Sequence, residues 1–330
     1  EPADRVALYF RLGQLAMETL EKPDQAAGAF EKVLATDPRH LPSLRSLEQL
    51  YEHAQMSEKL YRVLEAQAAV VTGTERERVL GKMAVTSAEG LSNVDHSITL
   101  YRELLAKNPR NEQAFEALNT LLDRAGRSEE LVELLMAKLQ VTIDPRELVR
   151  LNERVGRVLF ERLQRAEDAI PYFKAALDRD ARHRGALEAL KDIFEALGRR
   201  DDLVIILRRL IPLQEEASGV KVIRIRLAEI IAGSARREEA LDAARRALEV
   251  EPHRLEELER LLQVFMQLKA WPDAVRALEA KAQHYLLIEE RDQAAGVLFQ
   301  VADLWRYTAN KPDLAGAPLE RILEIDPANR

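Results

Sequence analysis

Histidine could give this sequence its most versatile chemistry, because imidazole ligates metals and acts as a general base near neutral pH. The chain of 330 residues has six histidines, and no two are three or four positions apart, the spacing that places two ligands on one helix face. His40 and His183 stand at the same place in two copies of a recurring turn, and His253 stands one position earlier in a third. Because copies of a repeat lie far apart in space, we expect solvated turn residues and no shared metal.

Other kinds of catalytic site find equally little support. There is no cysteine, which excludes thiolate zinc sites, cysteine nucleophiles and disulfides. The segment ASGVKV at 217–222 has one glycine, whereas a phosphate-binding loop needs clustered glycines before a helix. The 56 Asp and Glu residues are spread along the whole chain, so no carboxylate pair stands out. We therefore expect no catalytic residue, no cofactor and no metal, and a protein that is not an enzyme.

The composition narrows the class of partner. Lys and Arg number 49 and Asp and Glu number 56, for a net charge of −7, whereas a nucleic-acid or anionic-membrane surface requires a basic face. No uncharged apolar stretch approaches the ~20 residues that span a bilayer. We expect no nucleic-acid partner and no membrane insertion. The chain begins at Glu1 without a methionine, so we expect a fragment of a longer protein. Nothing specifies the oligomeric state or the compartment, although the cytoplasm is favoured.

A turn of the Asp-Pro type recurs along the chain. It begins at positions separated by 71, 72, 71 and 75 residues: Asp37, Asn108, Asp180, Glu251 and Asp326. The chain therefore holds four copies of a unit of about 72 residues and part of a fifth. After each complete turn, apolar residues fall at i, i+3 and i+7, which is the stripe of an amphipathic helix. The stripes are Leu44, Leu47 and Tyr51; Phe115, Leu118 and Leu122; Leu187, Leu190 and Phe194; and Leu258, Leu261 and Phe265.

Each 72-residue unit divides into two helical hairpins. In the break AGRSEEL, we expect Gly126 to end one helix and Ser128 to cap the next. Pro212 falls late in another helix and should kink or end it. No strand pattern occurs, so the prediction is an all-α fold with nine hairpins in one continuous solenoid over residues 1–330. The hairpins are expected at 4–38, 41–73, 75–109, 111–143, 146–181, 183–218, 220–252, 254–287 and 289–327.

The hairpins resemble the tetratricopeptide repeat (TPR) family. Its pattern puts Leu-Gly on the first helix and a small residue, an aromatic residue and a proline on or after the second. The matching residues are Leu12, Gly13, Ala26, Phe30 and Pro38; Val155, Gly156, Ala169, Phe173 and Ala176; and Ala240, Ala247 and Pro252. The resemblance covers the whole chain and implies a right-handed superhelix. The repeats are degenerate, and four of the five longer hairpins carry one extra residue in the turn.

In this family the first helix of each hairpin lines the concave groove, and the resemblance places twelve side chains there. They are Arg45, Gln49, Glu116, Thr120, Glu153, Arg157, Glu188, Asp192, Glu229, Glu259, Gln263 and Asp303. From Glu116 onward the set is mainly acidic, so we expect a partner segment that carries Lys or Arg. The alternative is that these carboxylates are simply solvated. Trp271 and Trp305 are expected to pack rather than to bind a ligand, since Trp is usually well buried.

The resemblance implies a scaffold or adaptor for protein–protein interaction, whose concave groove holds a peptide or a folded domain of another protein. Two other classes of function remain open. One is a regulatory sensor array attached to an enzymatic or DNA-binding domain outside this sequence. The other is a purely structural spacer, which would show no preferred groove charge.

Overall fold

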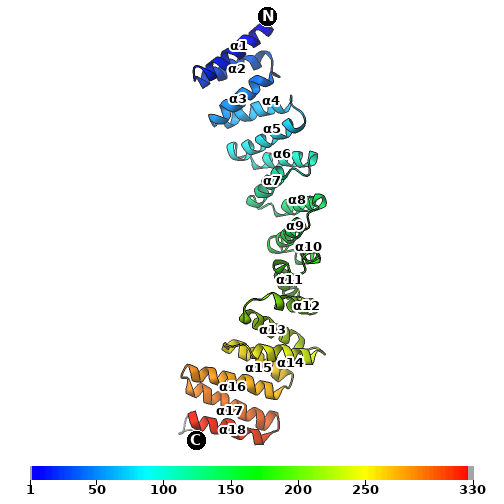
Figure 1. Ribbon diagram of the computed structural model, residues 1–330, viewed down its shortest axis with the longest axis vertical. Helices are drawn as coiled ribbons and strands as arrows, with labels where there is room; N and C mark the ends of the chain where they lie inside the picture. The colour runs from blue at the N-terminus through cyan, green and yellow to red at the C-terminus, as the bar shows by residue number, and fades with distance from the viewer. Residues whose placement is uncertain (1, 326–330) are drawn as a thin grey trace. The chain divides into compact units, whose positions relative to one another are not determined.

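The protein is all-α over residues 2–325, the part that the computed structural model describes (Figure 1). That part contains α-helices α1 to α18 with short π and 3₁₀ segments, and no β-strand. The contacts divide the chain into two compact units, Glu1–Leu163 and Gln164–Arg330. Within each unit the helices follow one another as antiparallel pairs, which is the architecture of a helical repeat.

Unit 1 contains nine α-helices and two π-helices within its described residues. They are α1 (Pro2–Glu18), α2 (Pro23–Thr36), α3 (Leu41–His53), α4 (Ser57–Ala68), α5 (Gly73–Val85), η1 (Thr86–Gly90), α6 (Val94–Lys107), α7 (Glu112–Arg124), α8 (Ser128–Val141), α9 (Pro145–Arg157) and η2 (Val158–Arg162). Odd-numbered helices are the first helices of the expected hairpins, and even-numbered helices are the second.

Unit 2 contains the remaining helices. They are α10 (Ala166–Arg179), α11 (Arg184–Ala196), α12 (Arg200–Leu210), η3 (Ile211–Leu213), α13 (Ala217–Ala232), α14 (Arg237–Leu248), α15 (Leu255–Gln267), α16 (Trp271–Leu287), α17 (Arg291–Asp303), η4 (Leu304–Thr308), η5 (Pro312–Ala315) and α18 (Gly316–Ile325). Each of the nine expected ranges thus holds two α-helices; the fifth range is shared between the units, and residues 326–327 of the ninth lie outside the described part. Whether the units form one continuous solenoid stays a prediction.

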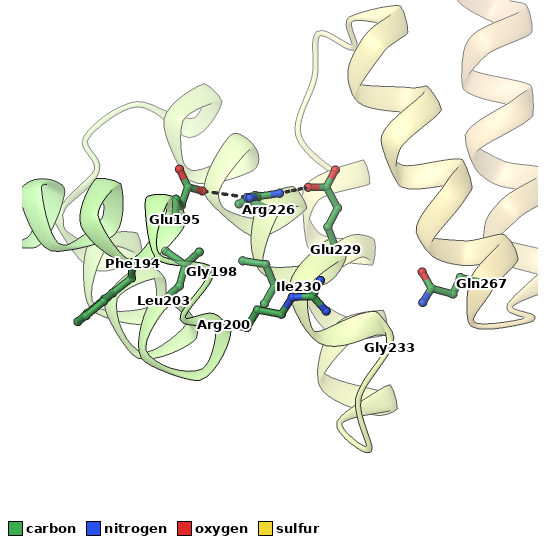
Figure 2. Close-up of a pocket in the computed structure, with 10 residues that line it drawn as sticks. All are labelled: Phe194, Glu195, Gly198, Arg200, Leu203, Arg226, Glu229, Ile230, Gly233 and Gln267. Atoms are coloured by element: carbon green, nitrogen blue, oxygen red, sulfur yellow. Dashed lines mark hydrogen bonds and ion pairs between the residues drawn. The ribbon is translucent and has the colours of Figure 1, made fainter. Parts of the chain in front are cut away.

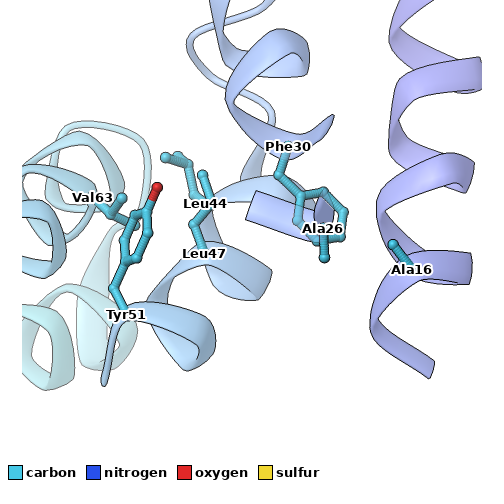
Figure 3. Close-up of a cluster of buried hydrophobic side chains, with 7 residues drawn as sticks. All are labelled: Ala16, Ala26, Phe30, Leu44, Leu47, Tyr51 and Val63. Carbon is cyan, nitrogen blue, oxygen red and sulfur yellow. The ribbon is translucent and has the colours of Figure 1, made fainter. Parts of the chain in front are cut away.

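Apolar contacts between successive helices join α1 to α4 of unit 1 (Figure 3). Phe30 of α2 is fully buried among Ala16 of α1 and Leu44 and Leu47 of α3. Gly13 lets α1 approach, because a Cβ atom at this position would lie 2.6 Å from Cε1 of Phe30. Burying a side chain of this size contributes roughly 1.5–3 kcal/mol. The small–aromatic pattern of the sequence therefore marks the contact between the two helices of a hairpin.

The extra residue of the longer hairpins lies at the end of the first helix and not in the turn. In three of them the first helix ends in a π-helix (η1, η2 and η4), and in four a backbone N–H donates to the carbonyl five residues earlier just before a left-handed residue, an arrangement that we call the π-turn. The donor and acceptor pairs are Leu20 and Leu15 (3.2 Å), Leu91 and Thr86 (3.0 Å), Leu163 and Val158 (3.1 Å), and Ala309 and Leu304 (2.8 Å). The residue after each donor has φ between 50° and 55°; these residues are Glu21, Ser92, Gln164 and Asn310.

The breaks inside the shorter hairpins also use a left-handed residue. Gly126 has φ 68° and follows the end of α7, as expected. Ser128 does not cap α8: it is the first residue of that helix, and the N-cap residue Arg127 makes no side-chain cap hydrogen bond. The expectation for Pro212 is confirmed, because α12 ends at Leu210 and Pro212 lies in the 3₁₀ segment that follows.

The two tryptophans are less buried than expected. Trp271 is the first residue of α16 and Trp305 lies in η4, and both are half-buried. Both belong to unit 2, so tryptophan fluorescence reports on that unit alone.

Candidate partner-binding surface

The twelve predicted groove residues all lie on odd-numbered helices. In unit 1 they occupy α3 (Arg45, Gln49), α7 (Glu116, Thr120) and α9 (Glu153, Arg157). In unit 2 they occupy α11 (Glu188, Asp192), α13 (Glu229), α15 (Glu259, Gln263) and α17 (Asp303). Nine are exposed, and Glu153, Glu188 and Glu229 are half-buried. We call the solvent-facing side chains at these positions the odd-helix surface of each unit.

The unit 1 residues differ in how far their charges are compensated. Arg45 pairs with Glu75 of α5 at 3.2 Å. Arg157 pairs with Glu153 at 3.0 Å on its own helix. Glu116 has no ion-pair partner among the described residues and accepts only a long hydrogen bond, 3.4 Å, from Asn119. Glu116 is therefore the carboxylate of this set that is best placed to meet a partner's cation.

In unit 2 most of the predicted acidic residues already have cationic partners. The pairs are Glu188 with Arg184 (2.7 Å), Asp192 with Lys191 (3.1 Å), Glu229 with Arg260 (2.6 Å) and Glu259 with Lys281 (2.8 Å). Asp303 is exposed and has no ion-pair partner within residues 2–325. The negative electrostatic field on this surface is thus weaker than a count of carboxylates implies. The role of the surface in binding stays a prediction.

A buried carboxylate links α3 to its neighbours in unit 1. Glu48 is only 4% exposed and receives hydrogen bonds from Gln67 (2.8 Å) and Arg78 (3.0 Å). Lys82 Nζ lies 2.6 Å from the same carboxylate. Burial alone would raise the pKa of Glu48, but the bonds from Arg78, Lys82 and Gln67 outweigh it and lower the pKa from 4.5 to about 2. This group stays charged at neutral pH and has a structural role.

Ion pairs of one kind recur between successive odd helices. An acid near the end of one helix pairs with a base about one hairpin further along the chain. These pairs are Glu52 with Lys82 (2.8 Å), Asp123 with Arg154 (3.6 Å) and Glu195 with Arg226 (2.9 Å). The three acids occupy one position of the 72-residue unit and the three bases another. We call these ion pairs rungs; as exposed pairs, each contributes only ~0.2–1 kcal/mol.

A cavity of about 470 Å³ lies beside the Glu195–Arg226 rung in unit 2 (Figure 2). Figure 2 shows Arg226 between Glu195 and Glu229, with Arg200 and Gln267 at other sides of the cavity. Burial raises the pKa of Glu229, but hydrogen bonds from Arg260 and Arg226 outweigh it and bring the pKa below its usual value. A carboxylate held in its charged form between the guanidinium groups of Arg226 and Arg260 is a poor general acid.

A second hollow, of about 550 Å³, lies in unit 1 between α5, α6 and α7. Its lining includes the polar residues Glu77 and Arg78 together with Val85, which is 45% exposed. Gly81 contributes to the wall, and a Cβ atom there would meet nothing within 4 Å. A protein side chain could therefore enter this hollow without displacing the helix.

The turn histidines have structural roles that the sequence reasoning missed. Nδ1 of His40 accepts a hydrogen bond from the backbone N–H of Ser43, and Nδ1 of His183 accepts one from Ala186. Both are half-buried helix N-caps, so the expectation of solvated residues was wrong. The signal was available: both stand immediately before a helix, where N-cap residues belong.

His253 belongs to a buried cluster around Lys221 of α13. Lys221 is 1% exposed, and its Nζ donates to the carbonyl of Pro252 (3.0 Å) and lies 2.6 Å from Glu257. His253 Nδ1 is 3.1 Å from the same nitrogen. Burial, with the Lys221 charge beside it, lowers the pKa of His253. The cluster fixes the turn before α15 against α13, and no sequence spacing had indicated it.

Within residues 2–325 no group of three His, Asp or Glu side chains is arranged to hold a metal ion. No helix in that range combines the length and apolarity needed to cross a membrane. What the odd-helix surfaces offer is a set of exposed polar side chains and side-chain-sized hollows.

Comparison with known proteins returns solved TPR structures. The TPR2AB domain of yeast Sti1, in a complex with pHSP90, is 12% identical, with 81% of this chain and 99% of that chain covered and a TM-score of 0.38. PilF of Pseudomonas aeruginosa is 17% identical, with 78% and 97% covered and a TM-score of 0.34. YrrB, described as a TPR protein with an unusual peptide-binding site, is 15% identical, with 56% and 90% covered and a TM-score of 0.34.

No protein-family model and no curated protein matches the sequence. The class follows from the chain itself. Its small–aromatic helix contacts, its 72-residue period and its helical hairpins define a TPR-like helical-repeat protein.

Proposed function

We propose that this protein is an interaction scaffold that binds another protein through its odd-helix surfaces. The observation that carries the proposal is the row of exposed polar side chains on successive odd helices, at positions where packing requires no such residue. Thr120 of α7 and Gln263 of α15 occupy the same position in different copies of the repeat, and both face solvent. Groups placed in this way bind partners in extended repeat proteins.

The partner expected is a peptide segment or a folded domain that carries Lys or Arg. Glu116 in unit 1 and Asp303 in unit 2 support this, since each is an exposed carboxylate without an ion-pair partner among the described residues. An exposed pair of this kind contributes ~0.2–1 kcal/mol, so its larger effect is on the association rate and on specificity. Glu116→Lys combined with Asp303→Lys should therefore slow partner capture mainly at low salt, where screening is weak.

Site-specific photo-crosslinking tests which face binds. A photoreactive residue replaces Thr120 or Gln263 on the odd helices. Matched controls replace Glu129 of α8 or Glu279 of α16, which are also exposed but lie on even helices. In a lysate of the source organism, the odd-helix positions should form the same adduct and the even-helix positions should not. Adducts from the even-helix positions alone, or none from any position, would overturn the proposal.

A further inference from the structure

Helices α15 and α17 lack the rung that joins α3 to α5, α7 to α9 and α11 to α13. Alignment of the repeats puts Met266 where Glu52, Asp123 and Glu195 stand, and puts Gln300 where Lys82, Arg154 and Arg226 stand. Both members of the ion pair are thus replaced at the same junction, one by an apolar residue and the other by a neutral one. Met266 is 38% exposed, so the replacement does not extend the buried core.

A third charged position changes at the same place. Tyr307 in η4 stands where the other hairpins with a π-turn have Glu18, Glu89 and Glu161. Tyr307 is 70% exposed, which is unusual for so large a side chain in an otherwise polar position. The Arg306 guanidinium lies over its ring, 5.2 Å from the centroid. Three charged positions of the repeat have therefore become neutral or aromatic at one junction.

A hollow of about 330 Å³ occupies the place of the missing rung. Its apolar wall is formed by Leu262, Met266, Leu278, Leu304 and Tyr307, and its edge by Gln300, Asp303 and Thr308. Leu278 and Leu304 are 3% and 6% exposed, so these two side chains form the buried side of the hollow. A hollow of this size lies at the lower end of the ~300–1,000 Å³ range of ligand pockets, which suits one or two side chains.

We infer that this hollow is the anchor pocket for a partner peptide that places a bulky apolar side chain in it and a Lys or Arg against Asp303. The inference rests on the proposed function and names the chemistry that its partner presents to unit 2. The apolar wall selects the anchor, because burying such a side chain is the main source of binding free energy. The exposed Asp303 carboxylate, free of any ion-pair partner in residues 2–325, selects the cation.

The test uses a displayed library of random 12-residue peptides, panned against the chain and then measured one by one. Enriched peptides should combine a Leu, Met, Phe or Trp with a nearby Lys or Arg. Met266→Glu with Gln300→Arg restores the rung seen at Glu195 and Arg226, and should weaken these peptides about ten- to a hundredfold. Asp303→Asn should weaken them about two- to fivefold at low salt and less at high salt.

A matched control is Met136→Glu on α8 of unit 1, because Met136 is 41% exposed and lies outside the hollow. Circular dichroism checks that each variant is folded, and tryptophan fluorescence adds a check for the variants in unit 2. Peptides that bind the restored-rung variant as well as the parent chain, or a library without enrichment, would refute the anchor pocket. Neither result affects the crosslinks from Thr120 of α7, so the pocket and the proposed function fail independently.

Discussion

The contact between Gly13 and Phe30 makes a sharp prediction about helix packing in unit 1. Gly13→Ala places a Cβ atom 2.6 Å from Cε1 and 2.8 Å from Cδ1 of a ring that is fully buried. Overpacking of this kind costs about 1–3 kcal/mol, whereas replacing a helical glycine by alanine gains ~1 kcal/mol. Because both contacts are shorter than 3.0 Å, the cost should lie in the upper part of this range, about 2–3 kcal/mol, and we expect a net loss of about 1–2 kcal/mol in the local stability of α1 and α2.

Gly28→Ala in α2 is the matched control. A Cβ atom at Gly28 meets nothing within 4 Å, so only the gain in helix propensity remains and the hairpin should become up to ~1 kcal/mol more stable. Another copy of the repeat suggests a compensating substitution. In the last hairpin the residues equivalent to Gly13 and Phe30 are Ala302 and Leu319. Gly13→Ala with Phe30→Leu should therefore lose less stability than the two single changes added together.

Hydrogen exchange followed by mass spectrometry on peptides from α1 and α2 is the suitable assay, because it measures opening locally. The expected loss corresponds to roughly five- to thirtyfold faster exchange there, with no change in unit 2. If Gly13→Ala protects α1 and α2 as Gly28→Ala does, the close approach of α1 to Phe30 is not what holds this hairpin. An additive double mutant would lead to the same conclusion.

Glu48 should make the stability of unit 1 depend on pH. Its pKa falls from 4.5 to about 2 on folding, so its stabilisation is complete above pH 4.5 and is lost as the pH falls toward 2; this amounts to at most about 3 kcal/mol. Glu48→Gln should flatten that part of a series of urea-unfolding curves, and an unchanged slope would count against the network. Lys221→Met should cost unit 2 about 3–5 kcal/mol by leaving the Glu257 carboxylate unpaired. Adding Glu257→Leu should restore most of it by tryptophan fluorescence, and no recovery would show that the pair is not coupled. Gln55→Gly and Lys269→Gly should each raise the unfolding temperature, since both relieve a left-handed backbone (φ 54° and 52°) and gain up to ~1 kcal/mol; a lower temperature would show that the side chains matter more.

The hairpins could be predicted from the sequence because their signals are local. An Asp-Pro turn, a glycine such as Gly126 and an apolar stripe each act within one helix or its end. The π-turn at Leu91 was harder to predict from the sequence. An extra residue can be accommodated either in the helix or in the turn, and the packing of the neighbouring helices decides between them. The cap was misplaced by one residue at Ser128, which is within the ordinary uncertainty of helix ends.

The twelve residues of the candidate surface lie on the first helices of the hairpins, but ion pairs offset more of their charge than a count of carboxylates implies; their role in binding stays a prediction. Glu188 and its partner Arg184 are one turn apart, so their pairing could be read from a single helix. Glu229 and Arg260 are 31 residues apart, and their contact depends on how two hairpins stack. The change at Met266 and Tyr307 was visible in the sequence, but only when equivalent positions of the repeats are compared with one another.

The rungs have a consequence for how such an array can change in length. At Glu52–Lys82, Asp123–Arg154 and Glu195–Arg226 the acid always comes first and the base second. Recombination between two 72-residue units that contain a rung would join the acid of one unit to the base of another. A unit could therefore be gained or lost without placing like charges together. Met266 breaks this interchangeability, since a base joined to it would find no carboxylate. Of the junctions with this pattern of equivalent positions, α15–α17 is thus the one at which such an exchange would leave a base without its carboxylate.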